Sequence, residues 1–304
     1  MKKIAIVTGA SSGMGRDFAL LLSEFVKVDE IWVLARRIQK LKALAGEIEE
    51  KSGIHTRAIE IDLSGRSGVS AFGTLLECER ILCQSSGASR AAGALGAVKS
   101  TGTSGSSTES GVSGENGSTG FEISLLVNNA GFGTYGTFEE TDIQKELDMI
   151  DLNVTSLTGI TGYALPYMNK GSILINTASL ASFLPLGNFA VYGATKAYVL
   201  SFSMALAAEL KEKGVKVCAL CPGPVLTEFA NVASNGARKI VKNGEDCTKV
   251  VRHCLKNAVK GRKYAIYALK WKFKAFASRF VDRYLGAWFT YKYCKRPNGT
   301  NGVV

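Results

Sequence analysis

The sequence of 304 residues has no run of 18 consecutive apolar residues, which excludes a single helix that spans a membrane. The first apolar run, Ile4 to Val7, is only four residues long, and Gly9 follows it closely. We therefore expect no secretory signal peptide, because the apolar core of such a peptide is longer.

The cysteines lack the pattern of a disulfide framework or a zinc site. The seven cysteines are scattered and odd in number, which indicates reduced thiols in a cytoplasm. Cys218 and Cys221 form a Cys-x-x-Cys pair in an apolar run that predicts a buried strand, and no second such pair exists. Residues three apart on a strand point to opposite faces, so we expect no bound metal.

Acidic residues are scarce in the last part of the chain. Residues 238–304 contain 17 Lys and Arg but only 3 Asp and Glu, a balance of +14 within a total charge of +11. The first 237 residues therefore carry about −3. This split predicts a near-neutral catalytic domain with a basic extension, and we expect no nucleic acid partner.

Apolar strands and amphipathic helices alternate along the chain, which is typical of a doubly wound parallel sheet, the α/β Rossmann fold. The predicted strands are 3–9, 30–35, 57–63, 124–128, 172–177 and 215–220, with a seventh candidate at 264–267. The clearest helices are 15–25, 38–51 and 247–259. We expect one domain, in which 1–237 form the catalytic part and 238–304 complete the fold.

A segment rich in serine and glycine interrupts this alternation. Residues 85–120 contain 10 Ser and 9 Gly among 36 residues and almost no large apolar side chain. Such a composition buries too little surface to offset the entropy of ordering, so we predict a flexible insertion over 83–120. A regulatory or substrate-covering flap is the alternative interpretation.

The glycine-rich segment after the first strand predicts a site for a dinucleotide pyrophosphate. Thr8-Gly9-Ala10-Ser11-Ser12-Gly13-Met14-Gly15 leads from a strand into a helix. Gly9 allows a tight turn, Gly13 leaves room for phosphates, and Gly15 lets the helix approach the strand. The free N–H groups of the helix then face the anion. An ordinary turn is the alternative.

The end of the second strand indicates which nucleotide binds. Enzymes that use the unphosphorylated cofactor usually place an acidic residue there to bind the ribose 2′-hydroxyl. Here Ala35 leaves room, and Arg36 and Arg37 offer guanidinium groups that suit a 2′-phosphate. We expect NADP in preference to NAD. The alternative is that two exposed arginines merely begin a helix.

Tyr192 and Lys196 share one face of a predicted helix. A nearby ammonium favours the phenolate and so lowers a tyrosine pKa from about 10 toward the working pH, which suits a proton donor to a carbonyl oxygen. Ser179 follows a predicted strand, from which its hydroxyl can reach the same oxygen. The same spacing of Ser, Tyr and Lys recurs in the tail from Ser278, but no predicted strand precedes Ser278. Spacing alone therefore does not identify the catalytic set, and the surrounding motifs must decide between the two.

Seven motifs in order resemble the short-chain dehydrogenase/reductase family in its compact form. They are TGASSGMG, Asp62-Leu63, Asn128-Asn129-Ala130-Gly131, Asn153, Ser179, YGATK at 192–196 and PGPVLT at 222–227. The resemblance covers about residues 3–227 apart from the insertion. It implies the Rossmann fold and an NADP-dependent oxidoreductase that interconverts a carbonyl and an alcohol.

The resemblance implies a catalytic role for four residues. Tyr192 would be the general acid in reduction, and Ser179 would orient and polarise the carbonyl. Lys196 would hold the nicotinamide ribose and lower the pKa of Tyr192. Asn153 would hold a water that links Lys196 to solvent for proton relay.

The resemblance also implies a set of cofactor-binding residues. Asp62 would face the adenine, and Thr227 would hold the nicotinamide carboxamide. The full set is Gly9, Ser11, Ser12, Gly13, Met14, Gly15, Arg36, Arg37, Asp62, Leu63, Asn129, Ala130, Gly131, Tyr192, Lys196, Pro222, Gly223, Val225 and Thr227. One departure concerns Ser12, because members that prefer NADP often carry a basic residue there.

Aromatic and basic residues recur in the tail at three- or four-residue intervals and predict an amphipathic helix over 269–295. Its apolar positions are Leu269, Phe273, Phe276, Phe280, Tyr284 and Trp288. Such a helix caps a substrate cleft, packs within the protein or a homo-oligomer, or lies in a membrane interface. We expect a homo-oligomer located in the cytoplasm, with peripheral contact to the inner membrane face as one possibility.

The segment after the sixth strand usually shapes the substrate pocket in this family. Here it spans 225–243 and includes Leu226, Phe229 and Val232, with Phe183, Leu184 and Leu186 as further candidates. This apolar set favours a lipophilic small molecule such as a keto-lipid or steroid, and no basic residue obviously marks a small anionic substrate. A catalytically silent NADP-binding regulator and a membrane-associated scaffold are the alternative functions.

Overall fold

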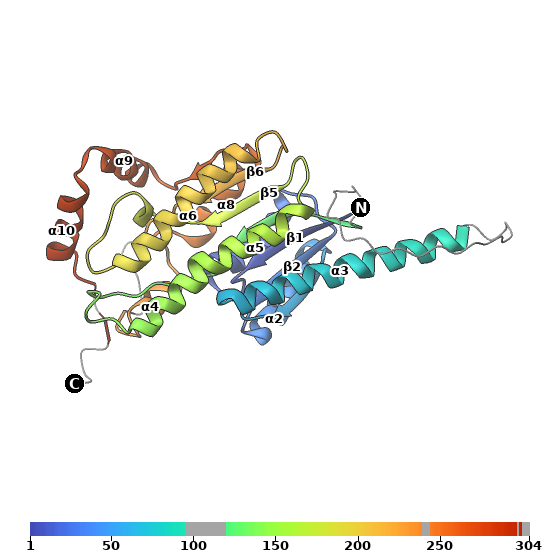
Figure 1. Ribbon diagram of the computed structural model, residues 1–304, viewed down its shortest axis with the longest axis horizontal. Helices are drawn as coiled ribbons and strands as arrows, with labels where there is room; N and C mark the ends of the chain where they lie inside the picture. Colours follow the sequence, from blue (N-terminus) through green and yellow to red (C-terminus); the bar gives the residue numbers. More distant parts are fainter. Residues whose placement is uncertain (95–119, 239–243, 297, 300–304) are drawn as a thin grey trace, which may run out of the picture.

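The computed structural model describes residues 1–94, 120–238, 244–296 and 298–299, and a parallel sheet lies at its centre (Figure 1). Within this part of the chain the strands are β1 (Lys2–Thr8), β2 (Glu30–Ala35), β3 (His55–Glu60), β4 (Phe121–Asn128), β5 (Ile173–Thr177), β6 (Lys216–Leu220) and β7 (Tyr264–Ala265). Their order is β3-β2-β1-β4-β5-β6-β7, with every neighbouring pair parallel. The predicted doubly wound α/β fold is confirmed.

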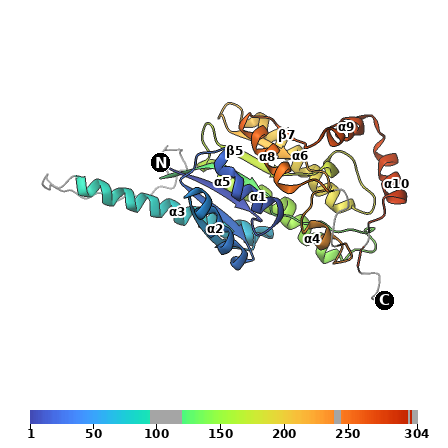
Figure 2. The same cartoon turned by 180° about the vertical axis from the view of Figure 1, so that it is seen from behind.

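Helices cover both faces of the sheet (Figures 1 and 2). On one face lie α1 (Gly13–Leu21), α2 (Ile38–Ser52) and α8 (Cys247–Val259), and on the other lie α3 (Gly65–Ala94), α5 (Leu157–Ala164) and α6 (Ala190–Glu209). The remaining α-helices described are α4 (Ile143–Ile150), α7 (Phe229–Ala233), α9 (Leu269–Ala277) and α10 (Arg283–Tyr293). Short 3₁₀ turns occur at Leu22–Glu24, Leu165–Tyr167, Leu180–Ser182 and Ser278–Phe280.

The two cysteines of the Cys-x-x-Cys pair are buried in different apolar clusters. Cys218 packs with the residues beneath α1, α2 and α8, whereas Cys221 packs beside α5 and α6. This separation follows from strand geometry, in which side chains three positions apart point to opposite faces. The prediction of a buried strand here is confirmed.

Helix α3 differs from the sequence expectation, because it continues to Ala94 and so includes the first part of the predicted insertion. Alanine and arginine are strong helix formers, and a helix that has already nucleated extends at little cost. Figure 1 shows α3 projecting beyond the sheet. Residues 95–119 of the predicted insertion lie outside the described residues.

The tail also differs, because two helices replace the single one expected over 269–295. Helix α9 ends in the turn Ser278–Phe280, and the chain is extended at Val281. Asp282 then begins α10 by accepting a hydrogen bond at Oδ1 from the N–H of Leu285 (2.9 Å). Among the described residues no helix combines the length and apolar character needed to cross a membrane.

The strand order sets the position of the functional site. Strands β1 and β4 are neighbours, but the connections from β1 to β2 and from β4 to β5 run toward opposite edges of the sheet. Loops after the two strands therefore diverge and leave a crevice at the carboxyl edge, which is where open α/β sheets bind ligands.

Candidate functional site

A cavity of about 750 Å³ opens at this carboxyl edge, a size that suits a small molecule or cofactor. The predicted residues that line it are Gly9, Ser11, Ser12, Gly13, Met14, Arg36, Arg37, Asp62, Leu63, Asn129, Ala130, Gly131, Ser179, Tyr192, Lys196, Pro222, Gly223, Val225 and Thr227. Gly15 and Asn153 lie outside the lining. We call the part beside Gly9–Met14 and Arg37 the glycine end, and the part beside Tyr192 the tyrosine end.

The glycine turn is held by close backbone contacts. Gly9 and Gly13 have φ values of 65° and 54°, which favour glycine. A Cβ on Gly15 would lie 2.2 Å from the carbonyl oxygen of Gly9, so only glycine lets α1 approach the strand this closely. Ser12 precedes α1 without a side-chain capping bond, which leaves the first-turn N–H groups free of a capping side chain.

The ends of β1 and β4 are locked together at the glycine end. The Thr8 hydroxyl oxygen accepts hydrogen bonds from the backbone N–H groups of Asn129 (3.0 Å) and Ala130 (3.1 Å). The Asn129 amide donates to the Thr8 carbonyl (3.3 Å). A Cβ on Gly9 would lie 2.8 Å from the Cα of Ala130, so these bonds bring the two strand ends into direct contact.

Arg37 lies against the glycine turn. Its Nη2 donates to the hydroxyls of Ser11 (2.9 Å) and Ser12 (2.7 Å), and its Nη1 pairs with Glu228 (3.0 Å). Lys40 contacts the same carboxylate at 3.2 Å. A guanidinium group therefore sits beside Ser12, the position where the sequence lacks a basic residue.

Asp62 and Arg36 form the other side of the glycine end. Burial tends to raise the pKa of Asp62, but hydrogen bonds from Ser64 and the charge of Arg36 outweigh it and hold the pKa below its usual value. The Ser64 N–H donates to Asp62 Oδ1 at 3.0 Å. Asp62 is therefore an ionised acceptor on the cavity wall at neutral pH.

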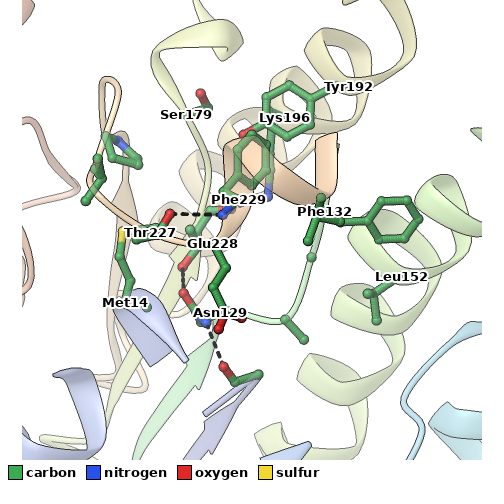
Figure 3. A pocket seen from close by; sticks show the side chains of 18 of the residues that line it. Met14, Asn129, Phe132, Leu152, Ser179, Tyr192, Lys196, Thr227, Glu228 and Phe229 are labelled. Atoms are coloured by element: carbon green, nitrogen blue, oxygen red, sulfur yellow. Dashed lines mark hydrogen bonds between the residues drawn. The ribbon is translucent and has the colours of Figure 1, made fainter. Parts of the chain in front are cut away.

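Ser179, Tyr192 and Lys196 gather at the tyrosine end, as Figure 3 shows. Tyr192 and Lys196 are buried and stand one turn apart on α6. The Lys196 ammonium donates to the carbonyl of Thr177 (2.8 Å) and lies 5.7 Å from the centroid of the Tyr192 ring. Burial lowers the pKa of Lys196 to about 8.

The structure corrects the expectation that Lys196 lowers the pKa of Tyr192. Burial raises the pKa of Tyr192 well above its ordinary value, and the groups that oppose this are the hydrogen bond with Ser179 and the charge of Arg296. The ammonium of Lys196 is directed to a backbone carbonyl instead. Tyr192 is therefore protonated at neutral pH, the state in which a phenol can donate a proton.

Asn153 lies in a π-helical turn, Asp151–Ser156, which joins α4 to α5. Its amide nitrogen donates to the carbonyl of Phe132 (2.9 Å) and the hydroxyl of Thr195 (3.1 Å). A Cβ on Gly131 would lie 2.6 Å from Asn153 Oδ1 and 3.5 Å from the Lys196 ammonium. Asn153 therefore stands behind the cavity wall, separated from Lys196 by the Gly131 backbone.

Aromatic side chains surround Tyr192 at the tyrosine end. Phe189 stacks on the Tyr192 ring with centroids 4.1 Å apart, and Phe229 lies 5.3 Å away. Tyr135 contacts Phe189 edge-on at 5.0 Å. Leu186, Phe229 and Val232 line the cavity as expected, whereas Phe183, Leu184 and Leu226 do not.

The tail supplies lining residues that the sequence did not reveal. Trp271 from α9 and Cys294 to Arg296, which follow α10, all reach the cavity. Two hydrogen bonds from the loop before α6 fix the tail: Gly187 N–H to the Thr290 hydroxyl (2.9 Å) and the Asn188 amide to the Tyr291 carbonyl (2.9 Å). Periodicity predicted one amphipathic helix here but did not identify the tail residues that line the cavity.

Residues 112–239 match the family model described as short chain dehydrogenase. A very-long-chain 3-oxoacyl-CoA reductase of Anas platyrhynchos is 29% identical over 235 residues, 75% of this chain and 62% of that protein. A serine 3-dehydrogenase of Rhizobium radiobacter is 36% identical over 125 residues, 40% of this chain and 50% of that protein. The chain thus spans less than two thirds of either relative.

Among solved structures, the fold is similar to a short-chain dehydrogenase from Sphingobium yanoikuyae in complex with NADPH. The TM-score is 0.68 at 23% identity, over 91% of this chain and 94% of that chain.

Proposed function

This chain belongs to the short-chain dehydrogenase/reductase family, and from that premise we propose that it interconverts a carbonyl and an alcohol with a nicotinamide nucleotide. The observation that carries the proposal is the buried, protonated Tyr192 beside the Ser179 hydroxyl on the wall of a large cavity. A hydroxyl pair of this kind suits proton transfer to a carbonyl oxygen.

The glycine end has the features that a dinucleotide requires. It offers an uncapped helix terminus, a turn without side chains at Gly9 and Gly13, and a carboxylate at Asp62. When such a nucleotide is bound in the cavity, its nicotinamide supplies or accepts the hydride. The residues of the turn would hold the pyrophosphate, and Thr227 would contact the nicotinamide amide.

The residues at the tyrosine end perform the proton chemistry. Ser179 donates a hydrogen bond to the substrate carbonyl oxygen and so polarises the carbon toward hydride. Tyr192 then gives its proton to the same oxygen, and the alcohol forms. Lys196 would hold the nicotinamide ribose, and the resulting phenolate regains a proton from solvent along the side where Asn153 stands.

Substitution of Tyr192 by phenylalanine tests this proposal, with Tyr198→Phe as the matched control. Tyr198 lies on the same helix, but its hydroxyl bonds to Thr158 and it does not line the cavity. Loss of a general acid typically costs about 10²- to 10⁴-fold in rate. We expect Tyr192→Phe to lose turnover of a ketone panel while cofactor binding, measured by fluorescence titration, persists. Full activity in Tyr192→Phe would refute the role.

The same experiment separates an enzyme from a silent regulator. A cofactor-binding regulator would bind NADPH but turn over none of the ketones and alcohols in the panel, even as wild type. The presence of Asn153, Ser179, Tyr192 and Lys196 together favours the enzyme.

We propose NADP as the preferred nucleotide, because Arg37 lies against Ser11 and Ser12 and Arg36 stands close by. A guanidinium group in that position suits a 2′-phosphate. The test compares kcat/KM for NADPH and NADH in wild type, Arg37→Ala and the control Arg16→Ala, whose side chain pairs with Glu47 outside the cavity. Equal kcat/KM for the two nucleotides in wild type would refute the preference.

We propose a lipophilic carbonyl or alcohol as substrate, since Tyr135, Phe189 and Phe229 present an aromatic wall next to Tyr192. The relatedness to a very-long-chain 3-oxoacyl-CoA reductase supports the same class. Turnover restricted to small polar ketones in the panel would contradict it.

The tail helices expose an apolar face that we propose contacts an anionic membrane surface. The exposed fractions of Leu269, Phe273 and Phe280 are 82%, 70% and 78%, which is unusual for such side chains. Four cationic residues lie between them in the sequence, Lys270, Lys272, Lys274 and Arg279, of which Lys270 pairs with Glu245. Aromatic and basic groups together favour the interface of anionic lipid, where each cation contributes about 1 kcal/mol.

Flotation with vesicles that contain phosphatidylserine tests this contact. We expect wild type to float at low salt and Phe273→Asp/Phe280→Asp to remain below. Phe138→Asp is the control, because Phe138 is also exposed (59%) but lies outside the tail. Failure of wild type to bind at low salt would refute the contact.

Homo-oligomer formation stays a prediction. Helix α4 carries Ile143, Leu147 and Ile150 on one exposed stripe, a surface that a second copy can cover. Light scattering on the purified chain measures the mass, and a monomer at micromolar concentration would refute the prediction.

A further inference from the structure

Two arginines line the tyrosine end of the cavity, although the sequence offered no obvious basic residue for substrate binding. Arg238 follows α7, and Arg296 follows α10. The guanidinium carbon of Arg296 lies 4.7 Å from the centroid of Phe189, the ring that stacks on Tyr192. The charges of both arginines act on the Tyr135 hydroxyl, so both stand at the same end.

Neither guanidinium is paired with a carboxylate among the residues that the structure describes. The ion-paired arginines there are Arg16, Arg37, Arg57, Arg80 and Arg252. Within the described part of the chain, the Arg296 guanidinium donates one hydrogen bond, from Nη1 to the carbonyl of Gly187 (3.0 Å). A guanidinium group has five N–H donors, so most of those on Arg296 remain available in the planar arrangement that fits a carboxylate or phosphate.

The acidic residues of the lining stand at the opposite end. Asp62 interacts with Arg36, and Glu228 is paired with Arg37 and Lys40. Among the described residues, no carboxylate of the lining offsets the positive charge at the tyrosine end.

Partly buried positive charge of this kind is costly without an anion. Burial and the charge of Arg238 both lower the pKa of Arg296, which shows that the two cations disfavour each other. An unpaired buried charge destabilises a fold unless a partner arrives. An anionic group between the two guanidinium groups would relieve both the desolvation and the repulsion.

We propose that Arg238 and Arg296 form a subsite for an anionic group, a carboxylate or a phosphate, on an otherwise apolar substrate. The apolar part of that substrate lies against Phe189, Phe229 and Tyr135, and the anionic group lies between the two arginines. The inference rests on the proposed reduction at Tyr192, because it concerns the molecule that enters the same cavity. It narrows the substrate from any lipophilic ketone to an amphipathic acid or phosphate ester.

Binding of unreactive probes tests the subsite independently of catalysis. Dodecanoate, dodecyl phosphate and the neutral dodecanamide are titrated calorimetrically into the full chain below their micelle concentrations. We expect at least one of the two anions to bind wild type about tenfold more tightly than the amide, since a hydrogen bond to a charged group is worth about 1.5–3 kcal/mol. The stronger anion identifies carboxylate or phosphate.

Arg296→Gln and Arg238→Gln should each weaken binding of the stronger anion about tenfold and leave the amide unchanged. Arg279→Gln is the matched control, because Arg279 lies in the tail but outside the cavity. Arg296→Lys keeps the charge and should retain most of the affinity, which separates charge recognition from the support that Arg296 gives to the Gly187 loop. Thermal melts verify that each variant is folded.

Equal affinity for the anions and the amide in wild type, or no binding of any probe, would overturn the subsite. Unchanged anion affinity in folded Arg296→Gln would overturn it as well. Tyr192→Phe should bind the stronger anion normally, so loss of the proposed reduction and loss of the subsite give different results.

Discussion

Replacement of Lys196 by methionine should change how the stability of the protein depends on pH. Lys196 is 5% exposed, and burial lowers its pKa from 10.5 to about 8. Between these values the unfolded chain binds a proton that the folded chain does not, so stability rises as pH rises. Relative to low pH, the fold is therefore more stable above pH 10.5, where Lys196 is neutral in both states. This stability is lost as pH falls through 8, because the buried Lys196 must then carry a charge.

The size of the effect follows from the two pKa values. One pKa unit corresponds to about 1.4 kcal/mol, so holding the ammonium charged at pH 7 costs the fold about 3 kcal/mol. Most of that cost disappears by pH 10. Wild type should therefore gain about 2 kcal/mol relative to Lys196→Met between pH 7 and pH 10.

Urea unfolding of both proteins without nucleotide at pH 7, 8, 9 and 10 measures this difference. Other lysines, tyrosines and cysteines titrate in the same range, but they are common to both proteins and cancel. Methionine also removes the donor to the Thr177 carbonyl, which shifts the stability of the variant by a similar amount at every pH. A difference between the two unfolding free energies that stays constant with pH would refute the burial of a charged Lys196.

Three further predictions concern the turn, the nucleotide and the tail. Gly15→Ala should destabilise the protein by about 1–3 kcal/mol and abolish nucleotide binding, because the new Cβ would clash with Gly9. Gly46→Ala has open space around it in α2 and should stabilise the protein by about 0.5–1 kcal/mol. Urea unfolding of the two variants measures this difference in sign. Glu228→Gln should lower KM for NADPH at most about fivefold by releasing Arg37, and an increase in KM would contradict this competition. Asp282→Ala removes the cap of α10 and should cost about 1 kcal/mol in thermal unfolding, with an unchanged Tm as the refuting result.

Periodicity predicted the helices that lie on the sheet more accurately than those of the tail. In α2 the buried residues are Leu41, Leu44, Ala45 and Ile48, the same stripe that the sequence indicates. A helix on a sheet buries one face, so its apolar residues repeat with the period of the helix. The tail repeats apolar residues in the same way, yet most of them are exposed. Periodicity predicts that a helix has an apolar face, but it does not identify what covers that face.

The sequence likewise predicted one part of the candidate site and not another. Apart from Gly15 and Asn153, the cofactor-binding and catalytic residues predicted from the motifs, from Gly9 to Thr227, line one cavity. Arg238 and Arg296 could not be found, because both lie among many basic residues in a segment without a motif. The pKa of Tyr192 was also beyond the sequence, since it depends on burial and on Arg296, neither of which the spacing of Tyr192 and Lys196 reveals.

The tail connects the exposed apolar face to the chemistry of the cavity. Trp271 in α9 lines the cavity, while Phe273 and Phe280 close by in the chain are exposed to solvent. After α10 the chain turns inward and brings Arg296 against Phe189, and Thr290 holds the loop at Gly187. A molecule with an apolar chain and an anionic end would partition into the same interface that the exposed face favours. The aromatic wall and the two arginines would then receive the two parts of that molecule, so the proposed membrane contact and the proposed anionic subsite would select one class of substrate.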